Sequence, residues 1–261
     1  MSDEEYPIFE EEPTSPSEEA SHEDQQSADG SYPVFDEEQV PMYEEETPFE
    51  GAEFVDNPEP RCPCVLLLDT STSMSGQPIN ELNSGLHSFK QELLQDELAA
   101  KRVEVAVVSF GPVTVETDFQ TPDVFTPPTL EANGETPMGA AIEQALNMVH
   151  ERKEVYKQNG INYYRPWVFL ITDGAPTDPW GNAAQCVKAG EQDGSIAFFP
   201  VGVQDANMDV LGKLSKRTPL KLQGLQFQDL FAWLSKSLQR VSQSQLGTEV
   251  NLPAPTSWAE I

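Results

Sequence analysis

A short apolar run that ends in a cluster of polar side chains constrains the fold of this chain most strongly. Residues 64–68 are five apolar residues in succession, as expected for a strand that is buried on both faces. Asp69, Ser71 and Ser73 follow at once and place a carboxylate and two hydroxyls at alternate positions of one loop. In open α/β sheets, ligands bind outside the carboxyl ends of the strands. The pattern therefore predicts an α/β fold with a ligand site directly after this strand.

Strand-like and helix-like segments alternate along the rest of the chain. Further strands are predicted at residues 103–110, 167–172 and 196–203, with residues 113–119 as a hairpin partner. Apolar residues at helical spacing lie between them and predict helices along Ile79, Leu82, Leu86, Phe89 and Leu93, along Met138, Ala141, Ile142, Ala145, Leu146 and Val149, at 182–191, around 210–214, and along Phe227, Leu230, Phe231, Leu234, Leu238 and Val241. Repeated β-then-α units predict a Rossmann-like, doubly wound, mainly parallel sheet with helices on both faces.

The acidic charge is concentrated at the N-terminal end. Residues 1–60 contain 21 of the 44 Asp and Glu residues and none of the 15 Lys and Arg residues. The segment is rich in Glu, Ser and Pro, and it lacks periodic apolar positions, so it cannot bury enough apolar surface to offset the entropy lost on ordering. We therefore predict a disordered acidic arm over residues 1–57, one domain over residues 58–247 and a C-terminal tail over residues 248–261.

The arm contains a recurring short pattern. Residues 6–12 read apolar-Pro-apolar-aromatic followed by acidic residues, and the pattern returns at 32–38 and, more loosely, at 40–46. One interpretation is local bias in a Glu-rich tract. The other is a multivalent linear motif that docks into a groove of a partner. In the second interpretation the partner-binding aromatic residues are Tyr6, Phe9, Tyr32, Phe35 and Tyr43.

Composition disfavours several classes of function. Of the net charge of −29, −21 belongs to residues 1–60 and −8 to residues 61–261, which disfavours binding to nucleic-acid phosphates. No stretch is long and apolar enough to span a bilayer, and the acidic N-terminus is unlike a secretory signal. Cys62, Cys64 and Cys186 do not form a disulfide framework, and Cys62 and Cys64 lack the second pair of a zinc site, so we expect structural burial. We expect a cytoplasmic protein.

Two later segments add oxygen donors at similar places. Thr136 lies in Gly-Glu-Thr-Pro-Met-Gly, and Asp173 follows the strand predicted at residues 167–172. An Asp-x-Ser-x-Ser motif, a distant Thr and then Asp-Gly after an apolar strand resemble the metal-ion-dependent adhesion site of von Willebrand factor A (VWA) domains. Residues 61–79, 134–142 and 169–178 further resemble bacterial TerY/YegL-type domains from tellurium-resistance gene clusters. The resemblance extends over about three quarters of the chain.

The resemblance implies a binding site for Mg²⁺ or Mn²⁺. Ser71, Ser73 and Thr136 would bind the ion directly, and Asp69 and Asp173 would act through water. An open coordination position would then accept a carboxylate from a partner protein. The expected function is a metal-dependent protein–protein interaction module, not an enzyme, in a stress-response or signalling system, with kinase- or phosphatase-like partners from the same gene cluster.

One residue departs from the family pattern. Thr72 stands where relatives often have a small residue such as glycine. A β-branched side chain disfavours positive φ, so we expect no left-handed conformation there, and weaker metal binding than in relatives.

The same residues also have simpler interpretations. Asp69, Ser71 and Ser73 resemble turn or helix-capping residues, Thr136 before Pro137 resembles a helix start, and Asp173 before Gly174 resembles a turn. Asp178 is expected to cap the helix that follows it. Two other functions remain open. The arm could bind partners independently of metal, with the domain as a scaffold, or the aspartates could hold a metal-activated water for phosphate hydrolysis.

Overall fold

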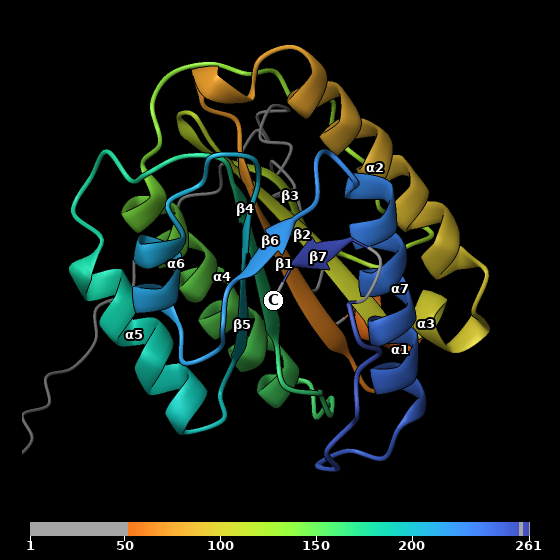
Figure 1. Cartoon of the computed structure of the whole chain (residues 1–261). Helices are drawn as coiled ribbons and strands as arrows, with labels where there is room; N and C mark the ends of the chain where they lie inside the picture. The colour runs from red at the N-terminus through yellow and green to blue at the C-terminus, as the bar shows by residue number, and fades with distance from the viewer. Residues whose placement is uncertain (1–51, 256–257, 261) are drawn as a thin grey trace, which may run out of the picture. The chain divides into compact units, whose positions relative to one another are not determined.

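The computed structural model describes residues 52–255 and 258–260. Tyr6, Phe9, Tyr32, Phe35 and Tyr43 lie outside the described residues. The described residues form a seven-stranded sheet in the order β3-β2-β1-β4-β5-β6-β7 (Figure 1). Its strands are β1 (Cys62–Asp69), β2 (Val103–Phe110), β3 (Val113–Gln120), β4 (Trp167–Thr172), β5 (Ala197–Gly202), β6 (Leu220–Leu222) and β7 (Ala259–Glu260).

The sheet is mainly parallel, as the sequence predicts. β1 pairs in parallel with β2 on one side and with β4 on the other, and β5 and β6 continue the parallel order. β3 and β7 are antiparallel to their neighbours. From β1 the chain builds outward to β2 and β3 and then returns to β4 on the opposite side of β1. This reversal is the place where doubly wound sheets bind ligands.

Helices cover both faces of the sheet (Figure 1). One face carries α2 (Gln77–Leu94), α3 (Glu97–Arg102) and α7 (Phe227–Gln243), and the other carries α4 (Met138–Gln158), α5 (Gly181–Gln192) and α6 (Met208–Leu214). A short helix, α1 (Ala52–Val55), precedes β1, and a 3₁₀ turn, η1 (Thr72–Met74), follows it. None of the helices in the described residues is long and apolar enough to cross a membrane.

β1 is buried along its whole length. Successive side chains of a strand point to opposite faces of the sheet. Leu66 and Leu68 accordingly belong to the core beneath α2 and α7, whereas Val65 and Leu67 belong to the core beneath α4 and α5. This burial on both faces explains the uninterrupted apolar run. Asp69, the last residue of β1, is the first acidic residue after this apolar run.

The packing extends beyond the domain predicted at residues 58–247. On the N-terminal side, Phe54 is buried, and the Asn57 side chain donates a hydrogen bond to a backbone carbonyl at the end of α3. On the C-terminal side, Leu252 packs against the core and Trp258 is buried. Residues 54–57 therefore belong with the packed domain, as does much of the segment after residue 247.

A buried carboxylate organises the opposite end of the sheet from Asp69. Glu104, near the start of β2, is 2% exposed and accepts hydrogen bonds from Arg61 Nε at 2.8 Å, Arg152 Nε at 2.8 Å and the Tyr156 hydroxyl at 2.5 Å. Both guanidinium groups also lie over the ring of Phe54, at 5.2 and 5.3 Å from its centroid. Glu104 thus balances two cations and anchors the chain where it enters β1.

Removing this carboxylate should destabilise the fold. Glu104→Gln leaves two guanidinium groups facing a neutral amide, and breaking a buried ion pair from one side costs about 3–5 kcal/mol. We expect the free energy of unfolding, measured by urea denaturation, to fall by about that amount. Glu154→Gln, in the exposed Glu154–Lys157 pair, is the control and should have little effect. Equal losses in the two variants would contradict a structural role for Glu104.

The cysteines should differ sharply in reactivity. Cys62 and Cys64 are buried and free, whereas Cys186 is exposed. Burial, assisted by the negative charge of Glu104, raises the pKa of the Cys62 thiol to about 12, and burial also raises the pKa of Cys64 well above its usual value. Because the thiolate is the reactive form, one thiol per native chain should react with DTNB at pH 8, and three after denaturation. A second fast-reacting thiol in the native protein would contradict this.

Candidate metal centre

The candidate site lies at the carboxyl ends of two paired parallel strands. Asp69 is the last residue of β1, and Asp173 follows directly after β4. Thr136, from the loop before α4, reaches the same place. A Cβ added to Gly174 would lie 3.2 Å from Thr136 Oγ1 and 3.8 Å from Asp69 Oδ2. The sheet topology therefore brings together three segments that are far apart in the sequence.

Hydrogen bonds connect four of the five predicted site residues. Ser71 Oγ lies 2.9 Å from Ser73 Oγ, and Ser73 Oγ donates to Asp173 Oδ1 at 2.7 Å. The backbone N–H of Ser71 donates to Asp69 Oδ1 at 2.8 Å, and the Thr172 hydroxyl donates to Asp69 Oδ2. Asp69 and Ser71 are buried, but Ser73 is exposed. The cluster thus has a buried carboxylate at its base and reaches solvent at Ser73.

The fifth predicted site residue is held by the loop that follows β4. Thr136 N–H donates to Thr177 Oγ1 at 3.2 Å, and Thr177 N–H donates to the Thr136 carbonyl at 2.9 Å. The expectation that Asp178 caps the helix after it was wrong. Asp178 instead accepts from the backbone N–H groups of Gly139 and Ala140, in the first turn of α4. It satisfies unpaired donors at that helix start and fixes the loop beside Thr136.

The electrostatic environment of the site is negative. Burial raises the pKa of Asp69, hydrogen bonds from Ser71 and Thr172 oppose that rise, and the charge of Asp173 adds to it. Burial also raises the pKa of Asp173, against the hydrogen bond from Ser73, and the charge of Asp205 adds to the rise. None of the described Lys or Arg side chains contributes to either shift. A bound cation would supply the missing positive charge.

The donor set fits a small hard cation. Among the described residues, no group of three or more His, Cys, Asp and Glu side chains could hold a metal ion, so hydroxyl groups would have to contribute. Mg²⁺ prefers oxygen ligands at 2.0–2.1 Å in an octahedral array, in which neighbouring ligands lie about 3 Å apart. The observed 2.9 Å between Ser71 Oγ and Ser73 Oγ matches that spacing.

Thr72 joins the two loops that carry the site. Its backbone N–H and its Oγ1 both donate to the Gly134 carbonyl, at 3.1 and 2.9 Å. Gly134 has φ +75°, a conformation that favours glycine, and the neighbouring Asn133 N–H donates to the Thr70 carbonyl at 2.6 Å. Thr72 itself has a negative φ, which confirms that the loop is not left-handed there. The side chain that replaces the usual small residue therefore helps to fix the segment leading to Thr136.

Two further residues shape the site without having been predicted. Thr172 orients Asp69 through its hydroxyl, and the same Oγ1 accepts from the Gly174 N–H at 3.1 Å. Gly174 lets the loop approach Thr136 closely, since an added Cβ would be tightly placed there. Both flank Asp173 in the sequence, so the position of Thr172 as the last residue of a predicted strand was an available signal.

Comparison with known proteins agrees with this architecture. The model of the von Willebrand factor type A domain matches residues 64–223. The chain belongs to this family. No curated protein sequence matches the chain. The matched range extends from β1 to β6 and contains all five predicted site residues, whose roles in metal binding stay a prediction.

Solved structures are similar at low sequence identity. Pilus adhesin SpaC from Lactobacillus rhamnosus GG, in its open conformation, has TM-score 0.56 and 13% identity, over 71% of this chain and 31% of the adhesin. Proximal thread matrix protein 1 from the mussel byssus, in crystal form 2, has TM-score 0.49 and 16% identity, over 70% of this chain and 49% of that protein. The SpRpn10 VWA domain has TM-score 0.46 and 13% identity, over 60% of this chain and 81% of that domain. The chain thus spans about half or less of the first two proteins, and the adhesin supports the fold alone.

The contact made by Thr72 can be tested directly. Thr72→Val keeps the β-branch and removes the hydroxyl that donates to Gly134. A neutral hydrogen bond contributes about 1 kcal/mol, so the amides of residues 133–136 should exchange with solvent about fivefold faster, as measured by hydrogen-exchange mass spectrometry. Thr114→Val, in which only a 3.5 Å contact to the Pro112 carbonyl is lost, is the control. Unchanged exchange in Thr72→Val would show that the hydroxyl does not hold this loop.

Proposed function

We propose that this chain is a divalent-metal-dependent protein–protein interaction module. Ser71, Ser73 and Thr136 hold Mg²⁺ or Mn²⁺ through their hydroxyls, and Asp69 and Asp173 act through water, as the family resemblance implies. The observation that carries the proposal is the 2.9 Å spacing of the two serine hydroxyls beside two carboxylates that no described cation offsets. The bound ion supplies an electrophilic position that a carboxylate of a partner protein can occupy.

The residues of the site divide this work by their burial. Asp69 is fully buried and fixes the loop through the Ser71 N–H and the Thr172 hydroxyl. Ser73 is exposed and lies at the opening, where a partner would approach. Neutral hydroxyl ligands leave more of the charge of a cation uncompensated than carboxylate ligands would. This arrangement suits binding, and it requires no nucleophile or base.

The sequence motifs extend the proposal to a biological setting. Because residues around the site resemble TerY/YegL-type domains, we infer that this protein has a role in a bacterial stress-response or signalling system such as tellurite resistance. In that setting it acts in the cytoplasm, is not an enzyme, and binds kinase- or phosphatase-like proteins encoded in the same gene cluster. This part of the proposal rests on analogy with the family.

Two other functions make different predictions. A scaffold that binds partners through its acidic arm would keep them after loss of the metal. A phosphohydrolase would require cationic groups to hold the phosphate, and no described Lys or Arg contributes to the pKa shifts of Asp69 and Asp173. The interaction module is therefore the better supported function.

Metal binding should depend on the exposed hydroxyl. Ser73→Ala removes one proposed ligand at the surface, whereas Asp69→Ala would leave the Ser71 N–H and the Thr172 hydroxyl buried without an acceptor. We expect Ser73→Ala to weaken Mg²⁺ binding at least about tenfold in isothermal titration calorimetry. Ser75→Ala, two residues along in the same exposed loop, is the matched control and should bind as the unchanged protein does. Equal affinities in all three proteins would refute the ligand assignment.

Partner binding should follow the metal. Proteins of the native host that the immobilised full chain retains in Mg²⁺ should be released by EDTA, because the proposed contact passes through the ion. Ser73→Ala should fail to retain the same proteins, and Ser75→Ala should retain them. Partners that stay bound in EDTA and on Ser73→Ala would favour the acidic-arm scaffold instead.

A further inference from the structure

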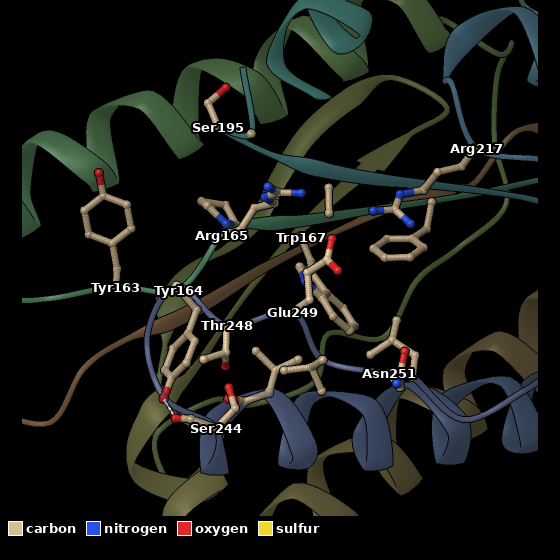
Figure 2. A pocket seen from close by; sticks show the side chains of 18 of the residues that line it. Tyr163, Tyr164, Arg165, Trp167, Ser195, Arg217, Ser244, Thr248, Glu249 and Asn251 are labelled. Atoms are coloured by element: carbon tan, nitrogen blue, oxygen red, sulfur yellow. Dashed lines mark hydrogen bonds between the residues drawn. The ribbon is translucent and has the colours of Figure 1, made fainter. Parts of the chain in front are cut away.

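A second candidate binding site lies at the opposite end of the sheet. A cavity of about 700 Å³ lies at the amino ends of β4 and β5 (Figure 2). Val241 near the end of α7 and residues 247–252 form its other wall. Its volume is in the range of small-molecule sites. Trp167 and Ala197, the first residues of β4 and β5, line it, whereas Asp69 and Asp173 lie at the carboxyl ends of their strands. The length of β4, at about 3.3 Å per residue, separates the two places.

The floor of the cavity is aromatic and well packed. Trp167 and Phe199 line it, with ring centroids 4.9 Å apart, and both side chains are largely buried. Val241 from α7 and Leu252 from the C-terminal segment add apolar wall. Phe199 stacks on Phe169, with ring centroids 4.5 Å apart, and also lies under the guanidinium of Arg217. Trp167, Val241 and Leu252 therefore form the apolar surface that is left for a ligand.

Two arginines face this floor. Figure 2 shows Arg165 and Arg217 on opposite sides of Trp167. The guanidinium of Arg217 lies 4.7 Å from the ring centroid of Phe199, and its side chain is 44% exposed, with a long 3.6 Å contact to Glu191. Arginine stacked on a ring in this way keeps N–H donors at its edge for a further partner.

Arg165 packs against Gly194 and has no carboxylate partner within salt-bridge distance among the described residues. A Cβ on Gly194 would lie 2.8 Å from Arg165 Nη2, so the guanidinium rests against a glycine whose φ is +76°. Among the described residues, Arg165 makes no hydrogen bond or salt bridge, although its positive charge helps to lower the pKa of Asp193. Arg165 is exposed and therefore available to an anion.

The charge around the cavity differs from that of the chain as a whole. Lys153 joins the two arginines in the lining, against the carboxylates of Asp193 and Glu249. Asp193 already accepts a hydrogen bond from the Ser195 N–H at 2.8 Å. The cavity lining has three cations and two carboxylates, with Glu191 3.6 Å from Arg217, so its charge balance is far less negative than that of the chain, whose net charge is −29.

We propose that this cavity binds a planar organic anion. Its carboxylate or phosphate lies between the guanidinium groups of Arg165 and Arg217, and its ring rests against Trp167 and Val241. Guanidinium groups suit both kinds of anion because they donate paired hydrogen bonds to two oxygens. The site is independent of the proposed metal centre and adds a small-molecule ligand to the function of the domain.

Binding of model anions tests the proposal. Phenyl phosphate, benzoate, inorganic phosphate and benzyl alcohol are titrated into the full chain in EDTA, so that the result does not depend on the metal centre. At least one aryl anion should bind about tenfold more tightly than benzyl alcohol and than inorganic phosphate. The aryl anion that binds more tightly, phenyl phosphate or benzoate, shows whether the site prefers a phosphate or a carboxylate. The proposal fails if neither aryl anion binds more tightly than both benzyl alcohol and inorganic phosphate.

Variants locate the binding. The double variant Arg165→Gln, Arg217→Gln should bind the aryl anion at least about tenfold more weakly. Glu249→Gln removes a negative charge from the wall and should strengthen binding about threefold. Lys236→Gln, which removes an exposed charge on α7 away from the cavity lining, is the matched control and should change nothing.

A variant that fills the cavity tests the proposal even if the double variant does not fold. Thr248→Trp keeps every charge and places a large side chain into the cavity from its exposed segment, so it should abolish binding while the thermal melting curve stays unchanged. Full binding by Thr248→Trp, or equal effects of the double variant and Lys236→Gln, would overturn the assignment.

Discussion

The pairing of β1 with a parallel strand on each side determines most of this structure. Because β1 lies between two parallel partners, β2 and β4, and helices cover both faces of the sheet, its side chains up to Leu68 are apolar without interruption. The same pairing places the end of β1 beside the end of β4, so that Asp69 and Asp173 meet although 104 positions separate them in the chain. A slip of one residue in register would turn every side chain of β1 to the other core.

The main elements could be predicted because they carry local patterns. The strands of six to eight residues and the long helices have apolar runs or stripes that are visible in the local sequence. The elements that escaped prediction lack such a signal. β6 and β7 have three and two residues, and they become strands only through tertiary pairing, β6 with β5 and β7 with β6. The burial of Phe54, within an acidic segment, depends on Arg61 and Arg152, which the local sequence cannot supply.

The candidate site shows the same division. Asp69, Ser71, Ser73 and Asp173 were found because strand ends can be located from the sequence, and the sheet then brings them together. The hydrogen bonds between loops could not be found in this way. Asp178 caps α4 rather than the helix that follows it, and Thr72 binds the carbonyl of Gly134. In both cases the partner is chosen by tertiary packing, to which rules of sequence spacing do not apply.

The ends of the sheet also differ in charge, and this difference bears on recognition. Arginines stand just before three parallel strands, with Arg61 before β1, Arg102 before β2 and Arg165 shortly before β4, whereas aspartates stand at or after the ends of β1 and β4. Two of these arginines are engaged by Glu104 and Glu59. Cations and carboxylates are therefore paired at the amino end, whereas the carboxyl end keeps Asp69 and Asp173 without a described cation to offset them.

This difference in charge would give the proposed metal dependence a second reason, separate from the open coordination position that the proposal assumes. Without a cation, the two aspartates would repel the carboxylate of an approaching partner, and their burial would strengthen that repulsion because the local dielectric is low. A divalent ion reverses the sign of the local charge at the place where Ser73 meets solvent. On the proposed function, the ion would thus both bind the partner carboxylate and remove the barrier to its approach.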